Sequence, residues 1–177
     1  SEIRIIIDAL EFDGVFPFAT ASLRNISNSK LVLEEIKHRC GLSIPVLSGK
    51  EEAFFDYYGA VSDAGTQEGI LIDVGGGSSE IVIFRDGKSL AVESLQAGSL
   101  NMYHRHVSGL IPTAEEIKKI EEDTRKLLQS CGKNLKEAAP EKGLNICAVG
   151  GTARAALKLH NSIYHLNKKN HIYERCF

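Results

Sequence analysis

The feature that most constrains the fold is a glycine run enclosed by two apolar segments, with an acidic residue at each end. Residues 73–80 read Asp-Val-Gly-Gly-Gly-Ser-Ser-Glu, and the apolar segments are 70–74 and 80–84. Both segments predict strands, and glycines between them allow backbone amides to approach an anion closely, because no Cβ intervenes. We therefore expect a phosphate-binding turn. Its residues are Gly75, Gly76, Gly77 and Ser78.

The two acidic residues of this motif, Asp73 and Glu80, stand seven positions apart. A tight strand–turn–strand should bring their carboxylates to one point at the mouth of the turn. Mg²⁺ prefers oxygen ligands and keeps several waters, so two carboxylates beside a bound phosphate are candidate ligands for it. The simpler interpretation is a flexible turn with two solvated acids, and the apolar strands on both sides disfavour it.

A second glycine turn, at residues 148–154, joins a predicted strand to a predicted helix start. Amides at a helix N-terminus attract anions. Gly150, Gly151 and Thr152 are therefore candidate phosphate-binding residues. Close packing between the strand and the helix explains the paired glycines equally well.

Glu52 and Arg24 are two further candidates. Residues 48–51 have the form of a capping box and open a helix with an apolar stripe. The residues predicted to form its packed face are Phe54, Tyr57, Tyr58 and Val61. Glu52 lies almost opposite this face, which by itself indicates a solvated acid. Arg24 follows a predicted strand end, where it would either clamp a phosphate or pair with an acid.

The rest of the chain alternates predicted strands and helices. The predicted strands are 15–20, 43–47, 89–95 and 144–149, and residues 3–7 predict either a strand or the end of a buried helix. Helices are predicted to begin at Ser29, Ser48, Thr113 and Thr152. The Thr113 helix is predicted from a capping box at residues 113–116 and from an apolar series that runs from Ile117 to Leu135. Asp86-Gly87 predicts a hairpin turn. Strands mixed with crossing helices indicate an α/β protein, with a hinge near residues 63–66.

Composition excludes several functional classes. The formal net charge is −2, so no broad basic field indicates nucleic-acid binding. No apolar stretch approaches the roughly 20 residues of a membrane span, and we expect no membrane association. The four scattered cysteines, without a Cys-x-x-Cys pair, are typical of reduced thiols in a cytoplasmic protein.

Together these segments resemble the exopolyphosphatase / guanosine pentaphosphate phosphatase (Ppx/GppA) family. The segments that carry the resemblance are 19–24, 47–53, 73–80, 95–99 with Gly98, and 149–155. The resemblance implies a ribonuclease-H-like fold of the actin-like ATPase superfamily, in which a mixed sheet is flanked by helices. It also implies that residues 1–66 are the C-terminal part of a first lobe and residues 67–177 most of a second.

The activity that this resemblance implies is Mg²⁺-dependent release of terminal phosphate from polyphosphate or guanosine pentaphosphate. Glu52 would activate the attacking water, while Asp73 and Glu80 would surround the metal. The glycine turn would hold phosphate, and Arg24 would be a looser phosphate contact. The family's first turn, Asp-x-Gly-Ser-Asn-Ser, does not occur before Asp73. We therefore expect an internal piece with an incomplete cleft, inactive by itself.

Two other functions remain open at this point. One is an actin-like-fold kinase, which needs a base near an acceptor hydroxyl and not near a water. The other is a non-catalytic module that senses a nucleotide or phosphate, and the missing first turn favours it for this chain. A second copy of the chain, forming a homodimer, also remains open as a partner.

Overall fold

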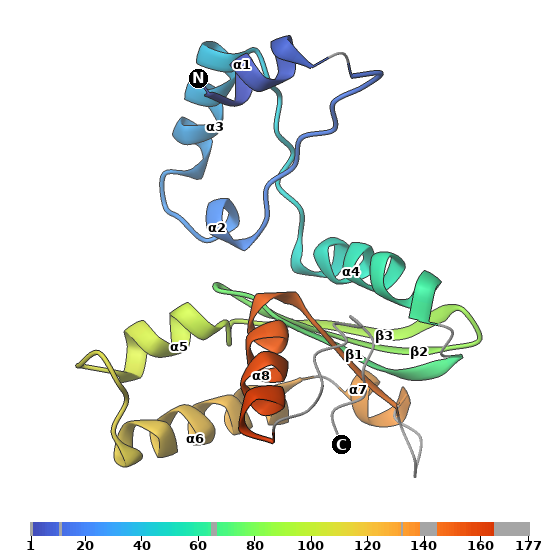
Figure 1. Cartoon of the computed structure of the whole chain (residues 1–177), viewed down its shortest axis with the longest axis vertical. Coiled ribbons are helices and arrows are strands. Elements are labelled where there is room, and N and C mark those ends of the chain that lie inside the picture. Colours follow the sequence, from blue (N-terminus) through green and yellow to red (C-terminus); the bar gives the residue numbers. More distant parts are fainter. Residues whose placement is uncertain (1, 11, 65–66, 132, 139–144, 165–177) are drawn as a thin grey trace. The chain divides into compact units, whose positions relative to one another are not determined.

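The computed structural model describes residues 2–10, 12–64, 67–131, 133–138 and 145–164. The chain forms two compact units, Ser1–Ser48 and Gly49–Phe177 (Figure 1). The sequence had predicted a division between residues 66 and 67. In the structure, the helix before that point belongs with the second unit, because its inner face packs on the sheet. The assignment of either part to a lobe of a larger protein stays a prediction.

The first unit is mainly helical. Its helices are α1 (Glu2–Ala9), α2 (Ala21–Arg24) and α3 (Ser29–Cys40). Residues 3–7 thus form a helix, but one without buried residues. The predicted strands 15–20 and 43–47 reduce to a single parallel bridge between Ala19 and Val46. Proline lacks the N–H that a ladder needs, and Pro17 and Pro45 stand beside this bridge.

The second unit is built on a mixed sheet of four strands in the order β3-β2-β1-β4. The strands are β1 (Glu68–Val74), β2 (Ser79–Arg85), β3 (Lys88–Leu95) and β4 (Ile146–Val149). The first three pair antiparallel, and β4 pairs parallel with β1. Asp86 and Gly87 have φ angles of 51° and 72°, as a two-residue hairpin requires. These strand predictions are confirmed, although residue 144, the predicted start of β4, lies outside the described residues.

Helices cover both faces of this sheet. They are α4 (Gly49–Ala64), α5 (Ser99–His106), α6 (Ala114–Ser130), α7 (Lys133–Ala138) and α8 (Gly150–Ile163). On one face, Tyr57 of α4 packs against Leu71 and Phe84. On the other, Met102 and Cys131 pack with Leu95. In the described part of the chain, no helix is both long enough and apolar enough to cross a membrane.

Helix α6 shows the capping box that its sequence predicts. The Thr113 side chain accepts a hydrogen bond from the Glu116 N–H, and the Glu116 carboxylate accepts one from the Thr113 N–H. The same carboxylate accepts hydrogen bonds from the Ser108 N–H and Oγ. These donors lower the pKa of Glu116 to about 2. The apolar series predicted for this helix ends earlier than expected, because α6 stops at Ser130 and Leu135 belongs to α7.

The packed face of α4 differs from the one predicted. Phe54 and Tyr58 are 45% and 65% exposed, whereas Ala53 and Tyr57 are 0% and 5% exposed. The side chain of Val61 lies outside the described residues. The small Ala53 allows α4 to lie close to the sheet, which two more aromatic rings on that face would prevent. Glu52 is consequently half-buried at the edge of the packed face and not opposite it.

Candidate active site

The register of β1 and β2 brings Asp73 and Glu80 together. The two residues are direct partners across the antiparallel pair. Side chains alternate between the faces of a strand, so Asp73 lies on the same face as Leu71, and Glu80 on the same face as Val82. That is the face covered by α4, because Leu71 and Val82 belong to its core cluster. Both carboxyl groups therefore lie under α4, at the end of the sheet where the glycine turn begins.

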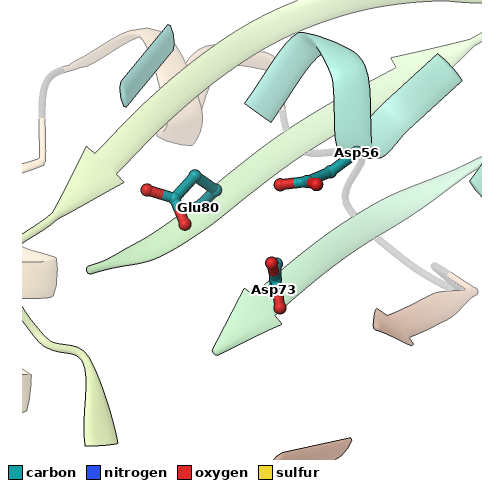
Figure 2. Close-up of side chains that lie close together, drawn as sticks. All are labelled: Asp56, Asp73 and Glu80. Atoms are coloured by element: carbon teal, nitrogen blue, oxygen red, sulfur yellow. The ribbon is translucent and has the colours of Figure 1, made fainter. Parts of the chain in front are cut away.

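Helix α4 adds a third carboxyl group to this site. Asp56, Asp73 and Glu80 each place a ligand oxygen within 4.8 Å of the others, and they come from the helix and from two neighbouring strands (Figure 2). Glu52 precedes Asp56 by four residues on α4, so the two lie on one side of the helix. Glu52 is also close enough for its charge to act on all three carboxyl groups.

Burial and mutual repulsion make these acids difficult to ionise. Burial is the main cause that raises the pKa of Asp56 to about 7, and the charges of Asp73, Glu80 and Glu52 add to it. Burial also raises the pKa of Asp73, and Glu52 adds to that shift. The same causes raise the pKa of Glu80. A cluster of buried carboxyl groups therefore favours binding protons or a cation over being fully ionised without a counter-charge.

Compensating contacts reach only part of the cluster. Glu80 is 1% exposed and its Oε1 accepts a hydrogen bond from Ser94 Oγ at 2.8 Å. By contrast, Asp56 Oδ2 and Asp73 Oδ1 are buried and have no hydrogen-bond partner within the described ranges. Buried carboxylate oxygens without partners are costly. A bound cation would remove that cost.

The glycine turn has the position that the sequence predicts. It connects β1 to β2 and is closed by a hydrogen bond from the Gly75 N–H to the Ser78 carbonyl at 3.0 Å. Ser78 is 2% exposed, and its side chain hydrogen-bonds Glu80, which opposes the rise in the pKa of that residue. The turn and the carboxyl cluster are thus directly joined.

The second glycine turn also lies at this site. Val149 is the register partner of Asp73, so α8, which follows, starts beside that carboxyl group. Gly150 has a φ of +85°, and a Cβ at this position would meet Asp73 Oδ1 at 2.0 Å. Gly151 and Thr152 follow as exposed residues in the first turn of α8, and Gly151 has open space around it. The charge of Arg154, on the same helix, lowers the pKa of Asp73 and opposes its neighbours.

The sequence model of the Ppx/GppA phosphatase family matches residues 1–172. The chain belongs to this family.

Solved structures agree with this assignment. An exopolyphosphatase-like protein is 26% identical, with a TM-score of 0.79, over 91% of this chain and 52% of its own. The Aquifex aeolicus member of the Ppx/GppA family is 26% identical, with a TM-score of 0.68, over 96% of this chain and 52% of its own. An exopolyphosphatase from Cytophaga hutchinsonii shares the fold, with 18% identity and a TM-score of 0.79. That match covers 94% of this chain and 53% of the Cytophaga protein.

These relatives confirm the ribonuclease-H-like fold of the actin-like ATPase superfamily that the sequence had implied. The present chain spans about half the length of the relatives it matches. Fold and family are therefore established, whereas the activity and substrates of a whole protein belong to the proposal below.

Arg24 lies in the first unit of this Ppx/GppA chain. It ends α2, and its Nη1 donates a hydrogen bond to the Leu47 carbonyl at 2.6 Å. This contact links the end of α2 to the segment just before α4. A phosphate contact for Arg24 stays a prediction.

Asp56 was not among the site residues predicted from the sequence. Its signal was its position four residues after Glu52, which predicts that both acids lie on one side of the helix. The aromatic residues Phe54 and Tyr58 concealed it, because they suggested a packed face rotated away from Asp56. The small residues Ala53 and Ala60, with Tyr57 between them, are the stripe that actually contacts the sheet.

Proposed function

We propose that this Ppx/GppA chain carries the catalytic carboxyl groups of a Mg²⁺-dependent phosphohydrolase that releases terminal phosphate from polyphosphate or guanosine pentaphosphate. The observation that supports this most strongly is the convergence of Asp56, Asp73 and Glu80 within 4.8 Å, directly beside a glycine turn. Family membership supports the reaction class.

The chemistry of the cluster fits Mg²⁺. Its donors are all carboxylate oxygens, and two of the buried oxygens have no hydrogen-bond partner in the described part of the chain. Two direct ligands of one Mg²⁺ lie at most about 4.2 Å apart, so a spacing near this value suits an ion that keeps some of its waters. When bound, the ion would neutralise charge on the phosphoryl group and on these acids. Asp73 and Glu80 are the ligands that the sequence proposed, and Asp56 is the addition.

Backbone amides would hold the phosphate. The turn at residues 75–78 stands at the end of β1, and the first turn of α8 starts beside Asp73. Both present N–H groups near the carboxyl cluster, where a phosphate would share the cation. Gly150 allows the close approach of α8 to Asp73, since any side chain would collide with that carboxyl group. Gly151 and Thr152 remain proposed phosphate contacts, as does Arg24.

Glu52 is the proposed general base. It is half-buried, on the same side of α4 as Asp56 and within electrostatic reach of Asp73 and Glu80. A base here would accept the proton of a water that attacks the terminal phosphorus in line with the leaving oxygen. The neighbouring acids that hold the cation would leave Glu52 as the carboxylate available for the proton.

Metal binding by the 177-residue chain tests the first part of this proposal. Isothermal titration with Mg²⁺ should show one site, and Asp73→Asn should weaken it by roughly 10-fold or more, since a charged ligand is lost. Asp13→Asn, an exposed aspartate of the first unit, is the matched control and should bind like the wild type. No binding by the wild type, or equal binding by Asp73→Asn, would contradict the proposed site.

Phosphate release tests the second part, in a chain extended to the length of its relatives. Polyphosphate and guanosine pentaphosphate should each be offered with Mg²⁺, and the initial rates compared. Binding of either compound without release would favour the non-catalytic module. Transfer of phosphate from ATP to an acceptor hydroxyl, without hydrolysis, would favour the kinase.

A further inference from the structure

The first turn of α5 is hydrogen-bonded to the carbonyl side of the glycine turn. The Ser99 N–H donates to the Gly75 carbonyl at 2.8 Å. The N–H groups of Leu100 and Asn101 donate to the Gly76 carbonyl at 3.0 and 3.1 Å. These are the orphan donors of a helix N-terminus, and here the turn satisfies them.

The side chain of Asn101 extends this contact to a third carbonyl. Its Nδ2 donates to the Gly77 carbonyl at 2.5 Å. Three consecutive carbonyl groups of the turn, those of residues 75–77, are therefore held by one helix end. In the hydrogen bonds that the structure shows, Asn101 is the side chain that holds the third.

Gly98 permits this contact. A Cβ at Gly98 would lie 2.4 Å from the Gly76 carbonyl oxygen and 2.5 Å from the Gly77 carbonyl carbon. Both are backbone atoms, so a side chain at Gly98 would have to displace the backbone of the turn. The φ of Gly98 is −70°, so alanine is excluded by contact and not by backbone conformation. A hydrogen bond from Ser79 Oγ to the Ala97 carbonyl, at 2.9 Å, fixes the preceding residue to β2.

These contacts determine where the amides of the turn point. A peptide unit is planar and trans, so its N–H is directed away from its own carbonyl. With three carbonyls facing α5, the N–H groups of Gly76, Gly77 and Ser78 face the opposite side of the turn. Within the described ranges, none of these three N–H groups donates a hydrogen bond to another residue. Consecutive free amides on one side of a turn form an anion site.

We propose that the first turn of α5 is a brace that holds the glycine turn in its phosphate-binding conformation, with Asn101 as the positioning residue and Gly98 as the point of contact. This inference rests on the proposed function, because it specifies how that phosphate site is kept open. Asn101 does not touch the phosphate; it acts by fixing the peptide between Gly77 and Ser78. The ligand is a phosphate or phosphoanhydride oxygen, held by the three amides.

The test uses the ¹⁵N-labelled 177-residue chain and inorganic pyrophosphate with Mg²⁺. In the wild type, the amide resonances of Gly76, Gly77 and Ser78 should shift on titration. Asn101→Leu keeps the size of the side chain but removes its donor, and pyrophosphate affinity should fall roughly 3- to 10-fold, the effect of about one hydrogen bond. The same three amides should also shift, and exchange faster with solvent, before ligand is added. His104→Leu, an exposed position one turn further along α5, is the matched control.

Gly98→Ala is the second variant and decides the matter if Asn101→Leu alters the spectrum far from the turn. It should displace the turn and weaken pyrophosphate binding at least as much. Wild-type binding that both variants retain would overturn the brace and leave the proposed function intact. Turn amides that do not respond to pyrophosphate in the wild type would overturn both the phosphate site and this inference.

Discussion

Asp56 places a third carboxyl group within 4.8 Å of Asp73 and Glu80, and this makes the cluster a source of pH-dependent stability. Burial and its neighbours raise the pKa of Asp56 from 3.8 to about 7 in the folded chain. Below the pKa of the unfolded chain, the Asp56 carboxyl group is protonated in both states and does not change the free energy of unfolding with pH. Between the two values only the unfolded chain loses the proton, so the free energy of unfolding falls as pH rises.

We expect Asp56→Asn to remove this loss. Without metal, the variant should be more stable than the wild type above about pH 7, and the difference should vanish below about pH 4. The difference in the free energy of unfolding should be on the order of 2 kcal/mol. This is about half of the value that direct conversion of the pKa shift gives, because the Asp56 side chain keeps part of its solvent. Urea unfolding in the presence of a chelator, at several pH values, measures it.

Excess Mg²⁺ at neutral pH should reverse the order, because a ligand that binds only the folded state stabilises it. Wild type would then gain more than Asp56→Asn. Asp13→Asn should follow the wild type throughout. Equal pH dependence in the wild type and in Asp56→Asn would show that Asp56 does not cause the loss of stability at high pH.

Glu52→Gln tests the proposed base in a chain of full family length. Turnover should fall by roughly 10²- to 10⁴-fold, with a much smaller change in KM, because a proton acceptor acts mainly in the transition state. The metal-free fold should be no less stable, since the substitution removes a charge that disfavours ionisation of Asp56 and Asp73. Steady-state kinetics and thermal unfolding measure the two effects. Near-normal turnover would show that Glu52 is a solvated acid and not the general base.

At the scale of elements, the junction of β4 and α8 offers a pair of adjacent glycines with opposite environments. Gly150 has a φ of +85°, and its absent side chain leaves room for Asp73 Oδ1. Gly151 has nothing within 4 Å of a built Cβ. The same substitution should therefore have opposite effects at neighbouring positions.

Gly150→Ala should destabilise the chain by roughly 1–3 kcal/mol, through an unfavourable backbone conformation, and should displace the Asp73 carboxyl group. Mg²⁺ binding should weaken in parallel. Gly151→Ala should leave metal binding unchanged and stabilise α8 by about 0.5–1 kcal/mol, because alanine loses less entropy in a helix. Thermal unfolding and Mg²⁺ titration of both variants decide the matter. Unchanged Mg²⁺ affinity in Gly150→Ala would show that the contact with Asp73 has no role.

At the scale of the whole molecule, the chain covers about half of its relatives, and no Asp-x-Gly-Ser-Asn-Ser turn occurs in its 177 residues. Phosphoryl transfer depends mainly on positioned charge, so a site without that turn should turn over slowly. We expect Mg²⁺-dependent phosphate release from polyphosphate to be at least about 100-fold slower than that of a full-length family member. Release at a comparable rate would show that the Asp-x-Gly-Ser-Asn-Ser turn is dispensable.

The sequence alone was sufficient for the elements whose signals are local. The apolar segment 80–84, the Asp86-Gly87 turn and the Thr113 capping box each depend on neighbouring residues, and each is confirmed. The convergence of Asp73 and Glu80 was also expected, because their seven-residue spacing across a tight turn makes them partners in the antiparallel pair. The sequence could not predict that residues 15–20 and 43–47 would form only one bridge, because strand length depends on available partners.

Tertiary packing alone decided the rest of the candidate site. Helical periodicity allowed either an aromatic face or a small-residue face on α4, and the close approach of Ala53 to the sheet selected the latter. That choice brought Asp56 to the carboxylates and moved Glu52 to the edge of the packed face. Likewise, the collision that excludes a side chain at Gly98 exists only after α5 folds back on the turn. Such contacts depend on the sizes of residues far apart in the sequence, which no local pattern encodes.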